Sequence, residues 1–286
     1  MADFGSLTNL IFFIFFILLF IWPGIKRRLV QAKRFQGIRS IEKDRRSRVI
    51  TMIHRQEAFA FLGIPFLRFI DIEESEKILR AIRFTPEDTP IDLVMHTPGG
   101  LVLAAEQIAR ALQKHKAKVT IIVPHHALSG GTLIALAADE VLMDDNAVLG
   151  PLDPQLGQLY PATSVLEVPK HKPLDKMKDE TLIYLDLAYK AVKQVEDLIV
   201  EILTRKKIAA ENARNIAKTL TRGEWTHDYP LTIDKLKEIG IDVTPKIPKN
   251  VYQLMELYPQ APQSRPTVEY IPVPYPRRER PSKEEH

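Results

Sequence analysis

A serine at position 129 lies in a setting that could make its hydroxyl reactive. It stands in the stretch "HHALSGGTLIALAAD", directly before two glycines and a run of small residues that reads as a helix. One interpretation is an ordinary helix cap, with the glycines serving a tight turn. The other is a nucleophile at a helix N-terminus, where unpaired backbone N–H groups stabilise negative charge. Ser129 alone does not decide between the two.

A second pair of glycines favours the nucleophile. Gly99 and Gly100 end the stretch "HTPGG", as Gly130 and Gly131 end "LSGG". Each pair follows a predicted strand and precedes a predicted helix, so two helix N-termini from neighbouring parallel strands could converge on one point. Backbone donors at that point would stabilise an oxyanion. Neither pair forms a Walker loop, because no Gly-Lys-Ser/Thr follows.

The elements around these turns alternate between strand and helix. Strands are predicted at 48–54, 91–97, 118–124 and 140–144, and helices at 73–84, 101–115, 129–139, 181–203 and 209–220. The stretch "LTIDKLKEIGIDV" ends the pattern with a helix and a short strand. Such alternation is typical of parallel β-α-β units, which makes the chain an α/β protein.

The N-terminus predicts a membrane anchor over residues 1–25. The stretch "LTNLIFFIFFILLFIW" is unbroken apolar sequence from Leu10 onward, and with its neighbours it approaches the ~20 residues of a spanning helix. Trp22 suits the membrane interface. A cleaved signal peptide is the alternative, but no Lys or Arg precedes the apolar run and no small-x-small site follows it.

Basic residues follow the anchor and predict its orientation. Between Lys26 and Arg48 there are ten Lys or Arg against two acids. By the positive-inside rule the N-terminus faces out, and the rest of the chain faces the cytoplasm. We expect residues 26–48 to be a partly helical juxtamembrane segment on anionic lipid, or else a solvated linker helix. This position favours membrane lipids over nucleic acid as the partner of the basic block.

Composition excludes some chemistry and predicts a distinct tail. The absence of cysteine excludes disulfides, thiol nucleophiles and cysteine-ligated metal. No His/Asp/Glu cluster shows metal-ligand spacing, so we predict no metal and no cofactor. Residues 244–286 hold nine of the 21 prolines, which predicts an extended or mobile tail, or one that lies on a partner.

The motifs together resemble a known family. The order T-P-G-G, S-G-G, an alanine-rich helix ending in A-A-D, and G-P-L-D-P-Q resembles the Clp-protease/crotonase fold. It is most similar to the SDH-type (serine dehydrogenase proteinase) family of membrane-anchored Clp-fold serine proteinases, related to signal peptide peptidase A. The resemblance covers roughly residues 40–243. It implies a spiral of β-β-α units over 49–243, preceded by one N-terminal transmembrane helix.

The resemblance also assigns roles at the turns. It implies that Ser129 is the nucleophile and that Gly130 supplies one oxyanion N–H. Gly99 and Gly100 match the turn that supplies the other donor and lines the substrate groove.

The general base is less clear. Where the Clp-subunit branch has a histidine, this chain has Asp153 and Pro154, which puts a Ser-His-Asp triad in doubt. The peptidase A branch uses a lysine from the segment that corresponds to "LEVPKHKPLDKMK". Lys172 is preferred, then Lys170, with Lys190 third because Asp186 suggests a surface ion pair for it.

A lysine base must be neutral, which requires desolvation. We expect "TSVLEV", residues 163–168, to be β-prone and to run through the interior, so that Lys172 and Lys170 are desolvated on the same side of an extended chain. His125 and His126 are alternative bases or polar neighbours of the site, and His96 is interpreted as structural. Asp153 could hold a turn or orient a base.

Three functions remain open. The first is a single-pass, cytoplasm-facing serine peptidase with a Ser-Lys dyad, which binds extended polypeptides by strand addition beside Gly99 and assembles into homo-oligomers. The second is a catalytically silent scaffold that binds polypeptides or partners at the membrane. The third is a crotonase-type acyl-CoA enzyme, which the anchor and the "LSGG" serine disfavour.

Overall fold

A parallel four-stranded sheet forms the centre of the molecule. The computed structural model describes residues 12–13, 15–54, 60–61, 64–65, 69–157 and 160–258. The sheet has the order β1-β4-β5-β7, so its neighbours in space are successive units along the chain. These strands are Arg48–Ile53, Ile91–His96, Val119–Val123 and Glu140–Met143. They confirm the four strands predicted from the sequence.

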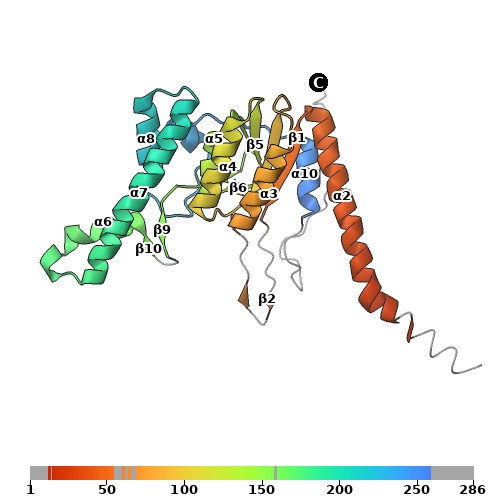
Figure 1. Cartoon of the computed structure of the whole chain (residues 1–286), viewed down its shortest axis with the longest axis horizontal. Helices are drawn as coiled ribbons and strands as arrows, with labels where there is room; N and C mark the ends of the chain where they lie inside the picture. Colours follow the sequence, from red (N-terminus) through yellow and green to blue (C-terminus); the bar gives the residue numbers. More distant parts are fainter. Residues whose placement is uncertain are drawn as a thin grey trace, which may run out of the picture.

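Helices connect the strands, as parallel pairing requires. They are α3 (Ile72–Arg83), α4 (Val102–Lys114) and α5 (Gly130–Ala137), which lie side by side in Figure 1. The bounds of each of these helices agree with the sequence prediction to within a few residues. Asp71 starts α3 as its N-cap, accepting a hydrogen bond of 2.8 Å from the Glu74 N–H.

Both faces of the sheet are covered, which is why its strands read as nearly continuous apolar runs. One set of strand residues packs with the connecting helices in the larger core. The alternate set faces a smaller cluster made with α2 (Trp22–Arg45) and α10 (Lys249–Glu256). Strand residues in this smaller cluster are Val49, Val94, Ile122 and Leu142.

Short strands and single bridges extend the main strands toward the two glycine turns. The segment after β4 reaches Thr97, which bridges to Ala127 of β6 (His126–Ala127), and β6 pairs in parallel with β8 (Val148–Leu149). Ile70 bridges to Gly100 in the same way. This second layer is the arrangement expected of β-β-α units, and it carries the chain from the sheet to the two glycine turns.

A helical arm extends from one side of the molecule (Figure 1). The elements beyond β8 are β9 (Gln155–Leu156), β10 (Tyr160–Pro161), α6 (Ala162–His171), η2 (Leu174–Lys176), α7 (Asp179–Arg205), α8 (Ala210–Thr221) and α9 (Ile233–Glu238). Helices α7 and α8 confirm the helices predicted at 181–203 and 209–220. The short strand predicted after α9 is reduced to a single bridge between Thr244 and Leu142. A further hairpin pairs β2 (Ala60–Phe61) with β3 (Ile64–Pro65).

The strand predicted over "TSVLEV" is wrong, because these residues lie within α6. Pro161 stands at the N-cap, and the half-buried Val165 and Leu166 lie on a helix that packs against α7. Contact with a long neighbouring helix therefore outweighs the β-propensity of Thr and Val.

The tail predicted from residue 244 is partly wrong as well, because residues 249–256 form α10. Val251, Leu254 and Met255 are spaced for one helical face and are buried against the smaller cluster. Gly37 of α2 allows the close approach, since a Cβ there would lie 3.1 Å from Leu254 Cδ1. The proline-rich part from residue 259 lies outside the described residues.

The basic segment 26–48 was expected to be partly helical, and α2 covers nearly all of it. A turn of π-helix, η1 (Ile17–Ile21), leads into α2. Within the described part of the chain, no helix is both long and apolar enough to cross a membrane. Residues 1–11 and 14 of the predicted anchor lie outside the described residues, so the anchor stays a prediction.

Candidate active site

Ser129 has an unusual backbone conformation at the turn between β6 and α5. Its φ is 49° and its ψ −118°, and its side chain makes no capping hydrogen bond. Among the described non-glycine residues, positive φ recurs only at Arg46 and Lys207, which follow helix C-termini. Strain of this kind at a strand-to-helix turn is a feature of exposed nucleophiles. The geometry therefore supports the nucleophile interpretation over the simple cap.

The start of α5 is fixed by backbone and threonine hydrogen bonds. The Gly131 N–H donates to the Leu128 carbonyl at 2.8 Å. Thr132 Oγ1 lies 2.8 Å from the Gly150 carbonyl and accepts from the Gly150 N–H at 3.0 Å. These bonds tie the "GPLD" turn to the base of α5, so the two motifs are held as one unit.

The two glycine turns converge on Ser129, as predicted. Gly99 has φ 105°, and a Cβ there would lie 2.7 Å from Ser129 Cβ and 3.3 Å from the Gly130 nitrogen. A Cβ on Gly100 would lie 2.3 Å from the Ile70 carbonyl oxygen. The backbone can pass this close to Ser129 at Gly99, and to Ile70 at Gly100, only because both positions lack side chains. Gly99 thus packs directly against the serine, and Gly100 follows it in the same turn.

A network of polar side chains inside the molecule supports the Gly99 turn. Thr97 Oγ1 accepts from the Gly99 N–H at 3.1 Å and lies 2.8 Å from His54 Nδ1. On its other side, His54 Nε2 lies 2.6 Å from Glu74 Oε2. Sequence reasoning missed this network because its members come from β1, α3 and the end of β4, and no local pattern links them.

The three candidate lysines lie at the surface of the arm. Lys170 pairs with Glu167 at 2.7 Å and Lys190 with Asp186 at 2.5 Å, with side chains 68% and 61% exposed. The ion pair predicted for Lys190 is thus present. Lys172 is exposed at the C-terminus of α6. The expected burial by an interior strand is wrong, because that strand is a helix. The choice of base stays a prediction.

Asp153 is buried beside the site and serves the turn. It accepts hydrogen bonds from Thr163 Oγ1 at 3.1 Å and from Gln155 Nε2 at 3.2 Å. Burial raises the pKa of Asp153 and outweighs these hydrogen bonds. The carboxyl joins the "GPLD" turn to the start of α6, which agrees with the turn role considered from the sequence.

A groove of about 550 Å³ begins two residues after Gly100. Val102, Pro154 and Gln155 line one part of it, and residues of α7 line the other. Leu101, Val102 and Leu103 are exposed apolar side chains at the start of α4. The groove also carries charged side chains, among them Glu106, Arg110 and Glu201, and Ser129 is not part of its lining.

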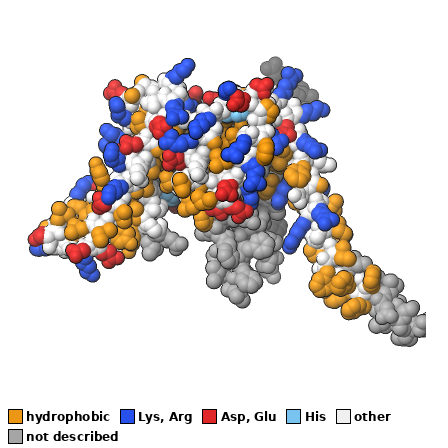
Figure 2. Space-filling model, viewed as in Figure 1, with side chains coloured by type: hydrophobic (Ala, Val, Ile, Leu, Met, Phe, Trp, Pro, Cys, Tyr) orange, Lys and Arg blue, Asp and Glu red, His pale blue; other side chains and the backbone are white. Residues whose placement is uncertain are grey.

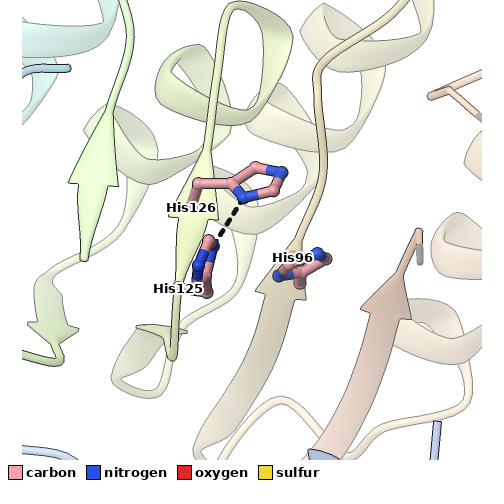
Figure 3. Close-up of side chains that lie close together, drawn as sticks. All are labelled: His96, His125 and His126. Atoms are coloured by element: carbon pink, nitrogen blue, oxygen red, sulfur yellow. Dashed lines mark hydrogen bonds between the residues drawn. The ribbon is translucent and has the colours of Figure 1, made fainter. Parts of the chain in front are cut away.

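Three histidines gather near these turns (Figure 3). His96 comes from the end of β4, and His125 and His126 from the segment that enters β6; one ring nitrogen of each lies within 4.8 Å of the others. We predicted no metal because no metal-ligand spacing is visible in the sequence. The three histidines come from two segments about thirty residues apart that the fold brings together, so spacing along the sequence does not report the cluster. The absence of a metal stays a prediction.

A strained serine that heads a helix on a parallel α/β sheet, with a second glycine turn packed against it, is the arrangement expected of a Clp-like serine hydrolase. The chain belongs to the ClpP-like SDH-type serine proteinases, whose family model matches residues 1–284. The family resemblance read from the sequence is thereby confirmed, and a serine proteinase is supported at the level of the family.

The chain also has full-length relatives. One uncharacterized protein of Methanocaldococcus jannaschii is 58% identical over 279 residues, which cover 98% of this chain and 94% of the relative. A second uncharacterized protein of the same organism is 52% identical over 270 residues, which cover 94% of each.

Proposed function

We propose that the chain is a membrane-anchored serine peptidase that cleaves extended polypeptide segments, with Ser129 as the nucleophile. The observation that carries the proposal is the strained Ser129 backbone, with Gly99 packed against its Cβ. A chain that needed only a helix cap would have no reason to keep this conformation, which costs of order 1–3 kcal/mol.

The chemistry follows from the groups around the serine. Ser129 Oγ attacks the scissile carbonyl carbon while its proton passes to a base, and the N–H groups of Gly130 and the Gly99–Gly100 turn stabilise the oxyanion. The C–N bond then breaks, and the base returns its proton to the leaving amine. Water, activated by the same base, hydrolyses the acyl-enzyme and restores Ser129.

The base in this proposal is a lysine that becomes desolvated on assembly, with Lys172 preferred over Lys170 and Lys190. The α6–α7 arm exposes apolar side chains at Leu174, Ile183 and Tyr189 (Figure 2). Covering these residues with a second copy would bury surface that is costly to leave in water. The same contact would remove water from the neighbouring lysines, so a homo-oligomer is part of the proposal.

The substrate is an extended polypeptide added along the groove beside Gly99 and Gly100. Backbone pairing with the short strands there would supply affinity, and the exposed Leu101 and Leu103 favour apolar segments. No nucleic acid and no cofactor enter this reaction.

The anchor and its orientation also remain part of the proposal. Exposed apolar side chains occupy η1 and the N-terminal end of α2, and Lys and Arg follow them along α2 (Figure 2). A lipid-embedded N-terminus with the catalytic domain on the cytoplasmic side accounts for this order of residues.

The test is hydrolysis of an unfolded protein substrate by the full chain in detergent. We expect Ser129→Ala to lose activity on the order of a thousandfold or more. Ser164→Ala, at an exposed position of α6, is the matched control and should keep wild-type turnover.

A silent scaffold is the second candidate, and the exposure of all three candidate lysines favours it. Such a protein would bind unfolded polypeptide with the same affinity in the wild type and in Ser129→Ala, and neither would release cleaved product.

A further inference from the structure

The histidine cluster lies where the two segments of the candidate active site begin. His96 precedes Gly99 by three residues, and His126 precedes Ser129 by three residues. The segments are joined by hydrogen bonds from the Thr97 N–H to the His126 carbonyl at 3.1 Å and from the Leu128 N–H to the Thr97 carbonyl at 3.0 Å. Any ligand that joins His96 to His126 therefore also joins the two turns.

We propose that His96, His125 and His126 bind one divalent transition-metal ion, with Zn²⁺ the best fit, and that the ion clamps the Gly99 segment to the Ser129 segment. The proposal concerns these three side chains and does not depend on peptidase activity.

The positions of the nitrogens suit such an ion. Zn–N bonds of 2.0–2.1 Å in a tetrahedron place ligand nitrogens about 3.4 Å apart. One ring nitrogen of each histidine lies within 4.8 Å of the others, and His125 Nδ1 and His126 Nδ1 are hydrogen-bonded to each other at 2.8 Å. In the proposal the ion replaces this hydrogen bond, and the exposed His125 ring and the half-buried His126 ring turn toward the ion.

The chemistry of the three imidazoles and the exposure of each ring indicate which metal ion the cluster would bind and how many ligands it would supply. Three imidazoles suit zinc, copper or nickel, whereas Mg²⁺ and Ca²⁺ prefer oxygen ligands. His96 is buried, His126 is half-buried and His125 is exposed, so the cluster has one side open to water. Three protein ligands with an open side leave the fourth position of the ion to water or to another small ligand.

The consequence for the molecule is a clamp close to the serine. His96 is the last residue of β4, while His125 lies in the connection between β5 and β6 and His126 is the first residue of β6. An ion held by both segments would limit the separation of the Gly99 and Ser129 turns. Binding only to the folded chain, it would also raise the melting temperature.

The experiment uses the full chain in detergent, without an affinity tag, after treatment with a chelator. Zn²⁺ is titrated by calorimetry, and Co²⁺ is added separately because a tetrahedral cobalt site gives intense visible absorption bands. We expect one ion per chain, a rise in melting temperature and a tetrahedral Co²⁺ spectrum.

Variants distinguish binding of Zn²⁺ at this cluster from binding at other histidines of the chain. His125→Ala removes an exposed ligand and should lower Zn²⁺ affinity more than about 100-fold, beyond the 10–100-fold loss typical of removing an outer partner. His171→Ala, at an exposed position of α6, is the matched control and should bind like the wild type. His96→Asn should also lose the ion, with circular dichroism to check that it folds.

Two results would overturn the proposal. One is a wild type that binds no Zn²⁺ at micromolar concentration. The other is equal affinity in the wild type, His125→Ala and His171→Ala, which would place the ion elsewhere. Neither result would bear on Ser129, because peptide hydrolysis is measured separately.

Discussion

The strained backbone conformation of Ser129 is held by the residues that pack around it. Gly99 and Gly130 supply the close backbone approach, and the His54–Thr97–Glu74 network supports the Gly99 turn from inside. If Ser129 is the nucleophile, as proposed, a serine fixed in this way needs no reorganisation when substrate arrives. The backbone strain at Ser129 therefore depends on all of these neighbouring residues together.

Gly99→Ala tests this packing. The new Cβ would lie 2.7 Å from Ser129 Cβ and 2.8 Å from the Leu128 carbonyl oxygen, so the serine must move. A displacement near 1 Å can cost about a hundredfold in rate, and we expect kcat/KM to fall at least that far. Gly240→Ala is the control, since its φ of 87° is also positive but its Cβ meets only ordinary contacts. Equal rates for the two variants would contradict the packing argument.

Asp153 gives a pH-dependent prediction. Burial raises the pKa of Asp153 above its ordinary 3.8, so the folded chain holds this proton more tightly than the unfolded chain does. Its contribution to the free energy of unfolding is therefore greatest below pH 3.8 and is lost as pH rises through the folded pKa. Asp153→Asn removes this titration. Urea unfolding across pH should show wild type losing stability relative to the variant as pH rises; a constant difference would refute the assignment.

At the scale of the element, an ion pair fixes helix α2 to the central sheet. Arg45 of α2 donates two hydrogen bonds to Asp92 of β4, at 2.6 and 3.0 Å, and Ser47 donates a third at 2.5 Å. The Asp92 side chain is only 2% exposed, and its hydrogen bond raises the pKa of Arg45. The basic helix is thus joined to the core at its C-terminal end.

Arg45→Ala should be strongly destabilising. It leaves a buried carboxylate without its cation, and breaking such a pair costs about 3–5 kcal/mol. Arg48→Ala breaks an exposed pair with Glu42 at 3.5 Å and should cost at most about 1 kcal/mol. Chemical denaturation of both variants checks the difference, and equal losses would show that Asp92 is not held as described.

A comparison of the predicted and observed helices and strands shows how much of the fold could be predicted from the sequence. The four strands of the central sheet and the helices α3, α4 and α5 were predictable because each has a clear period, and the two glycine turns follow from their order. The short strands β2, β3 and β6 were not predicted. Helix α6 was missed because its β-prone residues pack on α7, and α10 because prolines near it suggested an extended tail. The histidine cluster and the His54 network depend on contacts between segments that are distant in the sequence. Hydrophobic periodicity within one segment cannot predict such contacts.

At the scale of the whole molecule, the N-terminal segment stands apart from the domain it precedes (Figure 1). The C-terminal half of α2 is held by the domain, since Arg34 donates to the Leu257 carbonyl at 2.8 Å and Ile41 is buried. The apolar residues from Phe12 to Trp22 are exposed wherever their side chains are described. Under the proposed function, the C-terminal end of α2 contributes to the stability of the domain, and the N-terminal segment attaches the chain to lipid.

Removing residues 1–25 should separate these two roles. We expect the shortened chain to stay in solution without detergent and to keep the melting temperature of the full chain, because none of the described residues in this segment belongs to either core cluster. Membrane fractionation and circular dichroism provide the readout. A shortened chain that still sediments with membranes, or that unfolds tens of degrees earlier, would contradict this division.

Active-site labelling by a fluorophosphonate probe tests the central claim most directly, because the probe reacts only with a serine activated as a nucleophile. The full chain in detergent is treated with the probe, digested, and mapped by mass spectrometry. The account predicts one modified residue, Ser129, and no labelling of Ser129→Ala. Absence of labelling from the wild type under conditions where it binds polypeptide, or labelling that persists in Ser129→Ala, would contradict it.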